Sequence, residues 1–193
     1  MRVKICGITR PKDALHAEKE GADAIGVILF SESPRCVNPG RAREIFRSTG
    51  PFTTTVAVTH TRSRRELNRV LALHPDAIQI SHPFTFPRGQ PPVRVLRVVK
   101  PGDPLPADGD ALVVDGSRGT GRPYDLAYAT EVVQRSPVPV VLAGGLTPEN
   151  VAGAIRAVRP YAVDVASGVE VRPGIKDPAR VAEFIRAARG RLP

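Results

Sequence analysis

Eight short apolar runs recur along the chain, and amphipathic stretches separate most of them. The runs are rich in β-branched residues and almost continuously apolar, which is typical of parallel strands that helices cover on the outside. Eight alternating units of this kind can wind as a closed barrel or as an open sheet. The expected strands are residues 3–6, 24–29, 54–58, 77–80, 93–98, 111–114, 138–142 and 162–165.

The amphipathic stretches carry signals for the start and the end of a helix. Pro11 stands at an early position of the first stretch, and Gly21 follows its end. Thr147 precedes Pro148, which predicts an N-cap followed by proline at the first helical position. The expected helices are residues 11–20, 41–47, 64–72, 126–135, 148–158 and 178–189.

Two connections are too rich in proline to hold a full helix. Residues 82–92 contain four prolines, and residues 101–110 contain three prolines and two glycines. Proline removes a backbone donor and clashes with the preceding turn. Glycines follow the first, seventh and eighth strands, which favours closure of the sheet. We therefore expect an α/β fold, a compact single-domain (β/α)₈ TIM barrel over residues 1–193, with its fourth and fifth helices missing or reduced to turns.

The net charge of +9 comes from basic residues spread along the whole chain, and aromatic residues are scarce, with six Phe, three Tyr and no Trp. We therefore expect a solvated basic surface and no nucleic-acid partner. No apolar run approaches the roughly 20 residues that a membrane span needs, and the first residues do not resemble a signal peptide. This predicts a cytoplasmic protein, in which Cys6 and Cys36 stay reduced and unpaired.

Cys6 and Asp115 are the candidate catalytic residues, because the active site of such a barrel lies at the carboxyl ends of its strands. Cys6 ends the first expected strand and Asp115 follows the sixth, so they face each other across the rim. One group can then remove a proton while the other delivers one. The alternatives are that Cys6 is a small buried apolar residue and that Asp115 only caps a loop. Strand alternation points Lys4, Cys6 and Asp164 inward. Lys4 and Asp164 are expected to pair, and a purely structural ion pair is one interpretation. The other is that the Lys4 charge, about 7 Å from the thiol, favours its ionisation, although Asp164 reduces this effect.

The loops after the seventh and eighth strands form the candidate phosphate site. Gly144 and Gly145 lie in the first loop, and Ser167 and Gly168 lie in the second. Glycine lets a backbone approach a ligand closely, and free N–H groups near a helix start attract an anion. The alternative is that the two neighbouring glycines only make a tight turn. Two adjacent loops of this kind favour a phosphorylated substrate.

Arg35 follows the second strand and offers a guanidinium for a carboxylate, although an ordinary surface arginine is the alternative. Gln79 is the third of the four residues of the fourth strand and is expected to contact substrate. His16, His60 and His74 have the appearance of ordinary surface or helix residues. Because histidine, cysteine and carboxylate residues do not cluster at ligand spacing, we expect no metal site.

Four segments together resemble the signature segments of the phosphoribosylanthranilate isomerase family. They are KICGIT at 4–9, LAGGL at 142–146, VDVASGVE at 163–170 and PGIKD at 173–177. The resemblance runs from end to end. It implies a (β/α)₈ barrel of the tryptophan pathway, which converts N-(5-phosphoribosyl)anthranilate into the corresponding 1-amino-1-deoxyribulose phosphate by an Amadori rearrangement.

The resemblance also implies a role for each site residue. Asp115 would be the general acid that protonates the furanose ring oxygen, and Cys6 would be the general base that takes the proton from C2′. Arg35 would meet the anthranilate carboxylate, and no cofactor would be needed. The phosphate would be held by Gly144, Gly145, Ser167 and Gly168.

The chain departs from the family pattern at several positions. The family has Gln-Leu-His-Gly at the fourth strand, where this chain has Ser81 followed by His82. The family loop Gly-Gly-Thr-Gly begins here with Arg118, residues 124–126 replace Phe-Asp-Trp, and Ala166 replaces a serine. Another cofactor-free sugar-phosphate isomerase or epimerase on the same barrel is the alternative enzyme. A basic nucleic-acid-binding module is the non-enzymatic alternative.

Overall fold

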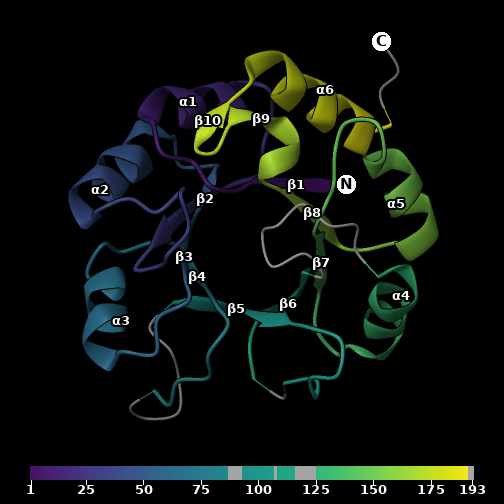
Figure 1. Ribbon diagram of the computed structural model, residues 1–193, viewed down its shortest axis with the longest axis horizontal. Coiled ribbons are helices and arrows are strands. Elements are labelled where there is room, and N and C mark those ends of the chain that lie inside the picture. The colour runs from purple at the N-terminus through teal and green to yellow at the C-terminus, as the bar shows by residue number, and fades with distance from the viewer. Residues whose placement is uncertain (87–92, 107, 116–124, 191–193) are drawn as a thin grey trace.

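Eight parallel strands form a closed barrel, seen end-on in Figure 1. The computed structural model describes residues 1–86, 93–106, 108–115 and 125–190. The first strand pairs with both the second and the eighth, so the predicted barrel is confirmed and the open sheet is excluded. The strands are β1 (Arg2–Ile5), β2 (Ala24–Leu29), β3 (Thr54–Thr59), β4 (Ala77–Ile80), β5 (Arg94–Val99), β6 (Ala111–Asp115), β7 (Val140–Ala143) and β8 (Ala162–Val165).

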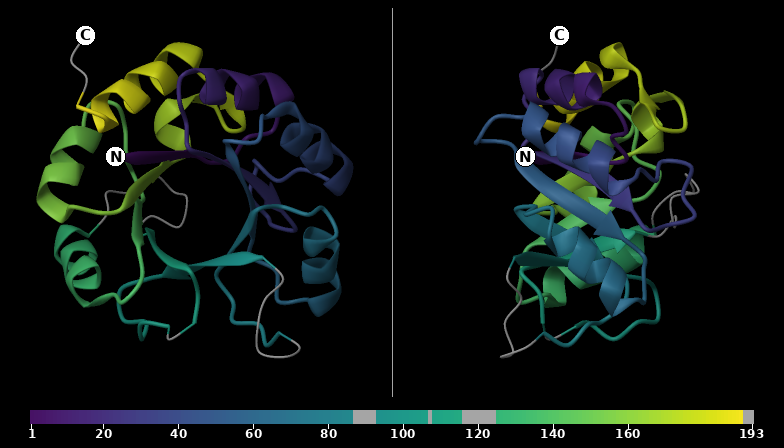
Figure 2. Two further views of the ribbon diagram at one scale, coloured as in Figure 1. Left: turned by 180° about the vertical axis from the view of Figure 1, so that it is seen from behind. Right: turned by 90° about the vertical axis from the view of Figure 1, so that its left-hand side faces the viewer.

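Helices cover most of the outside of the barrel, as the two views of Figure 2 show. Four of them begin with a side-chain oxygen that accepts a hydrogen bond from the first turn, supplied by Asn38, Ser63, Asp125 and Asp177. No helix among the described residues is long and apolar enough to cross a membrane. The helices are α1 (Pro11–Lys19), α2 (Pro39–Ser48), α3 (Arg64–Leu71), α4 (Leu126–Arg135), α5 (Val151–Val158) and α6 (Pro178–Ala188).

The predicted start of α5 is wrong. Residues 148–150 form a turn, and Asn150 takes the N-cap position without a capping side-chain bond. Its Oδ1 instead accepts a hydrogen bond from the amide of Thr147 at 2.8 Å. Thr147 and Pro148 therefore belong to the loop that follows β7, so Thr147 caps no helix there.

The ring of helices is open beside β5 and β6 (Figure 1). The described parts of the two proline-rich connections contain no helix, as predicted. Arg97 of β5 points to this outer side, like its neighbours Val95 and Val99, and it is buried there. Its guanidinium pairs with Asp108 and donates to the carbonyl of His82. A buried, paired arginine thus occupies a place that a covering helix would otherwise fill.

Apolar side chains form two separate layers. The larger core lies between strands and helices and includes Ile25, Leu142 and Phe184. Inside the barrel, smaller clusters that include Val56 and Val113 fill the lower part.

After β8 the chain forms a short 3₁₀ helix, η2 (Ser167–Val169), and a hairpin that the sequence did not predict, β9 (Glu170–Arg172) and β10 (Ile175–Lys176).

Candidate active site

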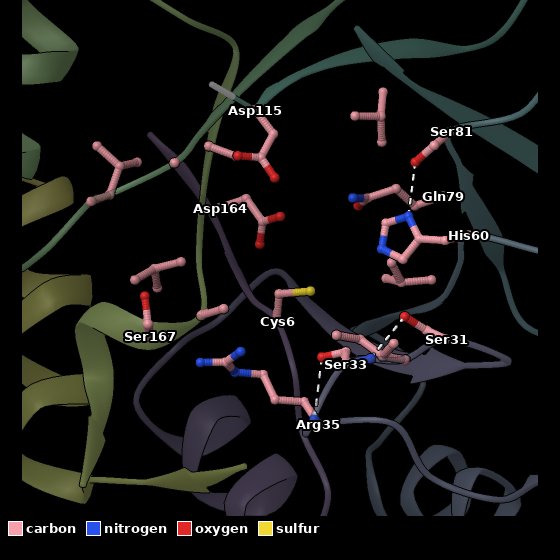
Figure 3. Close-up of a pocket in the computed structure, with 18 of the residues that line it drawn as sticks. Cys6, Ser31, Ser33, Arg35, His60, Gln79, Ser81, Asp115, Asp164 and Ser167 are labelled. Carbon is pink, nitrogen blue, oxygen red and sulfur yellow. Dashed lines mark hydrogen bonds between the residues drawn. The ribbon is translucent and has the colours of Figure 1, made fainter. Parts of the chain in front are cut away.

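A cavity of about 450 Å³ opens at the carboxyl ends of the strands. Figure 3 shows side chains from many strands converging on it. All but one of the predicted site residues line this cavity. They are Cys6, Arg35, Gln79, Asp115, Gly144, Gly145, Asp164 and Ser167.

Cys6 and Asp115 reach the cavity from different strands. Cys6 directly follows β1, and its amide continues the ladder by donating to the carbonyl of Val165 at 2.8 Å. Its side chain is buried, and the sulfur points into the cavity (Figure 3). Asp115 ends β6, and its carboxylate also points into the cavity. A ligand in this space would therefore lie between a thiol and a carboxyl group.

Lys4 lies inside the barrel under Cys6 and is held by two acceptors. Its Nζ donates to Asp164 Oδ2 at 2.7 Å and to Gln79 Oε1 at 3.0 Å. Lys4 and Asp164 are also register partners across β1 and β8, so the predicted ion pair is confirmed. The second oxygen of Asp164, Oδ1, is buried without a hydrogen-bond partner among the described residues.

Gly26 of β2 makes room for the thiol and the ammonium group. A methyl group added to Gly26 would lie 2.7 Å from the sulfur of Cys6 and 3.1 Å from Lys4 Nζ. Both atoms therefore lie within 3.1 Å of one point, closer together than the separation of about 7 Å that strand rise predicts. The long lysine side chain bends towards the sulfur, which brings its charge nearer.

The predicted effect of Lys4 on Cys6 has the expected direction, but it does not decide the net pKa of the thiol. Burial raises the pKa of the Cys6 thiol above its ordinary value, and the nearby Lys4 lowers it by less. Burial lowers the pKa of Lys4, but attraction to Asp164 and Cys6 outweighs that effect and the net pKa is raised. Lys4 thus stays protonated and offsets part of the cost of a buried thiolate.

Two glycine-bearing loops lie side by side at the rim. Gly144 and Gly145 both have positive φ angles, of 94° and 61°, which L-residues rarely adopt. Gly168 does not line the cavity, unlike the other predicted residues. A methyl group there would lie 1.9 Å from the carbonyl oxygen of Leu146, so the backbones of the two loops are in direct contact. Gly168 therefore fixes the position of the loops rather than facing a ligand.

Arg35 is already engaged by a carboxylate of the protein. Its Nε and Nη2 donate to Glu170, with the shortest contact at 2.7 Å. Lys176 Nζ donates to the same carboxylate at 2.8 Å. Burial raises the pKa of Glu170, but Arg35 and Lys176 outweigh it and the net pKa is lowered. One edge of the Arg35 guanidinium, formed by Nε and Nη2, is therefore bound to Glu170. The other edge, formed by Nη1 and Nη2, is the one that can meet a ligand.

The sequence of this chain matches one known protein family over most of its length. The family profile described as N-(5'phosphoribosyl)anthranilate (PRA) isomerase matches residues 3–83 and 104–187. An N-(5'-phosphoribosyl)anthranilate isomerase of Methanoregula boonei is 60% identical over 98% of this chain and 97% of its own. One from Pseudomonas aeruginosa is 42% identical over 99% of this chain and 96% of its own. The chain belongs to the PRA isomerase family.

Solved structures of the PRA isomerase family share the whole barrel. The Thermus thermophilus enzyme has a TM-score of 0.84 and 33% identity, and the match covers 98% of this chain and 99% of that one. A PRA isomerase in complex with reduced 1-(o-carboxyphenylamino)-1-deoxyribulose 5-phosphate has a TM-score of 0.79 and 31% identity, with coverage of 98% and 99%.

Sequence reasoning missed His60, which it placed among ordinary surface residues. His60 directly follows β3, lines the cavity, and its Nδ1 lies 2.9 Å from Ser81 Oγ. The signal available was its place at a strand end, the same signal that selected Cys6 and Asp115. Lys100, which follows β5, lines the cavity as well. Glu170 was also missed as the partner of Arg35, because the two lie 135 residues apart.

Of the positions that depart from the PRA isomerase pattern, the structure describes His82 but not Arg118 and Tyr124. His82 is not among the residues that line the cavity; its ring packs edge-on against Phe84, with centroids 5.3 Å apart. Arg118 and Tyr124 lie outside the described residues, as does the rest of the loop that corresponds to Gly-Gly-Thr-Gly in the family. The described residues contain no metal-ligating cluster, and their two cysteines are unpaired.

Exchanging Lys4 for Met is expected to move the titration of Cys6 to higher pH. The variant loses the Lys4 charge, which lowers the thiol pKa, whereas burial still raises it. Alkylation of Cys6 should therefore begin at a higher pH. We expect the whole labelling profile of the Lys4→Met variant to lie at higher pH than that of the parent. The measurement is the rate of iodoacetamide labelling against pH in a Cys36→Ala background. Lys12→Met, which removes an exposed lysine of α1, should leave the profile unchanged. An unchanged profile for Lys4→Met would contradict this assignment.

Proposed function

We propose that this chain catalyses the isomerisation of N-(5'-phosphoribosyl)anthranilate to 1-(2-carboxyphenylamino)-1-deoxyribulose 5-phosphate, a step of tryptophan biosynthesis. The observation that carries the proposal is that the sulfur of Cys6 and the carboxylate of Asp115 enter one cavity beside two glycine-bearing loops. Membership of the PRA isomerase family and the product-analogue complex of a structural relative support it. A cytoplasmic location stays a prediction.

Asp115 acts first, as the general acid. It donates a proton to the furanose ring oxygen, the C1′–O4′ bond breaks, and the nitrogen lone pair forms the C1′=N bond of a Schiff base. A carboxyl group that points into the cavity from the end of β6 can reach such an oxygen without a change in the barrel. The step requires a carboxylic acid at this place, because an amide cannot transfer a proton.

Cys6 acts next, as the general base. Its thiolate takes the proton from C2′, and the electron pair moves through C1′ to the nitrogen to give an enolamine. This intermediate then gains a proton at C1′ and loses one from O2′, which leaves the ketone. Lys4 stabilises the thiolate from below. Hydrogen moves only within the substrate and between acid and base groups, so the chemistry requires no redox cofactor.

Asp164 and Arg35 position the substrate around these two groups. The buried Oδ1 of Asp164 lacks a partner among the described residues and can accept a hydrogen bond from a sugar hydroxyl. The free edge of Arg35 can meet the anthranilate carboxylate, while Glu170 holds the guanidinium in place. Gln79, which holds Lys4, completes the wall beside the sugar.

The loops after β7 and β8 are proposed to hold the phosphate, with Gly168 fixing their mutual position. Gly168→Ala would place a methyl group 1.9 Å from the Leu146 carbonyl oxygen, so one loop must move. Such overpacking costs about 1–3 kcal/mol. We expect at least about a tenfold rise in the KM for the phosphorylated substrate and weaker competitive inhibition by inorganic phosphate.

Gly153→Ala is the matched control for Gly168→Ala. Gly153 lies within α5, and a methyl group there would find its nearest neighbour at 3.9 Å. Since alanine favours a helix interior over glycine by about 1 kcal/mol, the control should be as active as the parent and slightly more stable. Equal KM values for both variants would contradict the role of Gly168.

The test of the proposed function is the loss of fluorescence of phosphoribosylanthranilate on addition of the purified protein. Turnover supports the assignment, whereas a folded protein without turnover contradicts it. Another sugar-phosphate isomerase on this barrel would share the phosphate site but would not need Arg35. A nucleic-acid-binding module would instead show steeply salt-dependent binding to DNA or RNA.

A further inference from the structure

His60 occupies the wall of the cavity opposite the phosphate loops. It directly follows β3, and Ser81 directly follows β4. The Nδ1 atom of His60 lies 2.9 Å from Ser81 Oγ. Figure 3 shows that this contact turns the other ring nitrogen, Nε2, into the cavity, on the side away from Ser167. Nε2 has no hydrogen-bond partner within the part of the chain that the structure describes.

The position of the phosphate loops decides which end of the substrate reaches His60. With the phosphate at Gly145 and Ser167, and with the sugar between Cys6 and Asp115, the substrate must extend across the cavity towards β2, β3 and β4. The far end of phosphoribosylanthranilate is an aromatic ring with an ortho carboxylate. On this side, His60, Gln79 and Lys100 are lining residues that carry a nitrogen donor, and His60 directs Nε2 into the cavity. The Arg35 guanidinium extends from the loop after β2 towards Ser167 and pairs with Glu170.

The imidazole is suited to a carboxylate in its neutral form. Partial burial lowers the pKa of His60, the Lys100 ammonium lowers it further, and Asp115 raises it by less. A neutral ring that accepts the Ser81 hydroxyl proton at Nδ1 carries its own hydrogen on Nε2. The pocket-facing nitrogen is then a donor of fixed direction, and a hydrogen bond from it to a carboxylate would be charge-assisted.

We propose that His60, oriented by Ser81, is a specificity-determining residue that donates a hydrogen bond from Nε2 to the aryl carboxylate of the substrate. This inference rests on the proposed function, because the substrate defines which group reaches β3 and β4. Arg35 supplies the charge for the same carboxylate, and His60 supplies a second donor from the adjoining strand. The pair would select an ortho-carboxylated aniline over an unsubstituted one.

Amide substitutions separate the two ring nitrogens. The amide nitrogen of Gln falls near the place of Nε2, whereas that of Asn falls near Nδ1. His60→Gln should therefore keep the pocket-facing donor, and His60→Asn should keep only the contact with Ser81. A hydrogen bond to a charged group contributes about tenfold or more to binding. We expect KM to rise about tenfold for His60→Ala and His60→Asn, to stay within about threefold of the parent for His60→Gln, and kcat to change less than KM in each variant.

Two ligands test the carboxylate directly. One is reduced 1-(2-carboxyphenylamino)-1-deoxyribulose 5-phosphate, and the other is its anilino counterpart without the carboxylate. Calorimetry should show that His60→Ala weakens the first about tenfold and leaves the second unchanged. Ser81→Ala should weaken the first by less, and His82→Ala, a control outside the cavity, should weaken neither.

The outcomes distinguish the two hypotheses. Equal weakening of both ligands by His60→Ala, or an Asn variant that binds the carboxylated ligand like the parent, would overturn the role of His60. An absence of turnover by the parent protein would contradict the proposed function. The binding difference between the two ligands would still test His60 in that case, because it requires no catalysis.

Discussion

Cys6→Ser is expected to lower kcat/KM by about 10³-fold. A serine hydroxyl ionises far above the pH range of a thiol, so the fraction of base at neutral pH becomes negligible even though the side chain keeps its size and direction. Lys4 cannot compensate, because its charge lowers the pKa of the group at position 6 only in part. Steady-state loss of substrate fluorescence measures the change, and thermal unfolding shows whether the barrel is intact.

Cys36→Ser is the matched control for Cys6→Ser. Cys36 follows Arg35 on the loop after β2, but it is not among the residues that line the cavity, and its sulfur donates only a weak 3.8 Å contact to the Val37 carbonyl. Its replacement should leave kcat/KM within about twofold of the parent. A Cys6→Ser variant with near-normal turnover would exclude the thiolate as the base.

The barrel could be predicted from the sequence because its signals are local. Each expected strand lies within two residues of the observed one, since a fully buried parallel strand needs an apolar run and little else. The absence of helices from the described parts of the connections before and after β5 was predicted from their prolines. The predicted start of α5 was wrong because Thr147 and Pro148 satisfy a local rule for a helix start but lie in a turn. In this turn Asn150 Oδ1 accepts a hydrogen bond from the Thr147 amide.

The site was predictable where the strand order places residues together. Lys4 and Asp164 were paired correctly, since closure of the barrel makes β1 and β8 neighbours. Glu170 and Arg35 were not paired, because the unpredicted hairpin of β9 and β10 brings them together. The net pKa of Cys6 could not be predicted for a different reason. Strand spacing indicates the distance to a charge, but the extent of burial depends on every side chain around the thiol.

Asp115→Asn is expected to lower kcat/KM by about 10²–10⁴-fold. Asparagine keeps the shape of the side chain and its place at the end of β6, but it cannot give a proton to the ring oxygen. Binding of the reduced product should change by less than about threefold, because the same cavity remains. The matched control is Asp125→Asn, which removes a charge close by in the chain but keeps a good N-cap for α4. Near-normal activity of Asp115→Asn would reject the acid role.

A substrate with deuterium at C2′ separates the acid from the base. If Asp115 opens the ring, its loss makes ring opening limiting, and the isotope effect on kcat/KM should fall towards one. If Cys6 removes the C2′ proton, Cys6→Ser makes that step limiting, and the isotope effect should rise to its intrinsic value. The two variants would then respond in opposite directions although both are nearly inactive. Equal isotope effects in the two variants would contradict the assignment of Asp115 and Cys6 to separate steps. The sulfur and the carboxyl group, although on different strands, would then act in the same step.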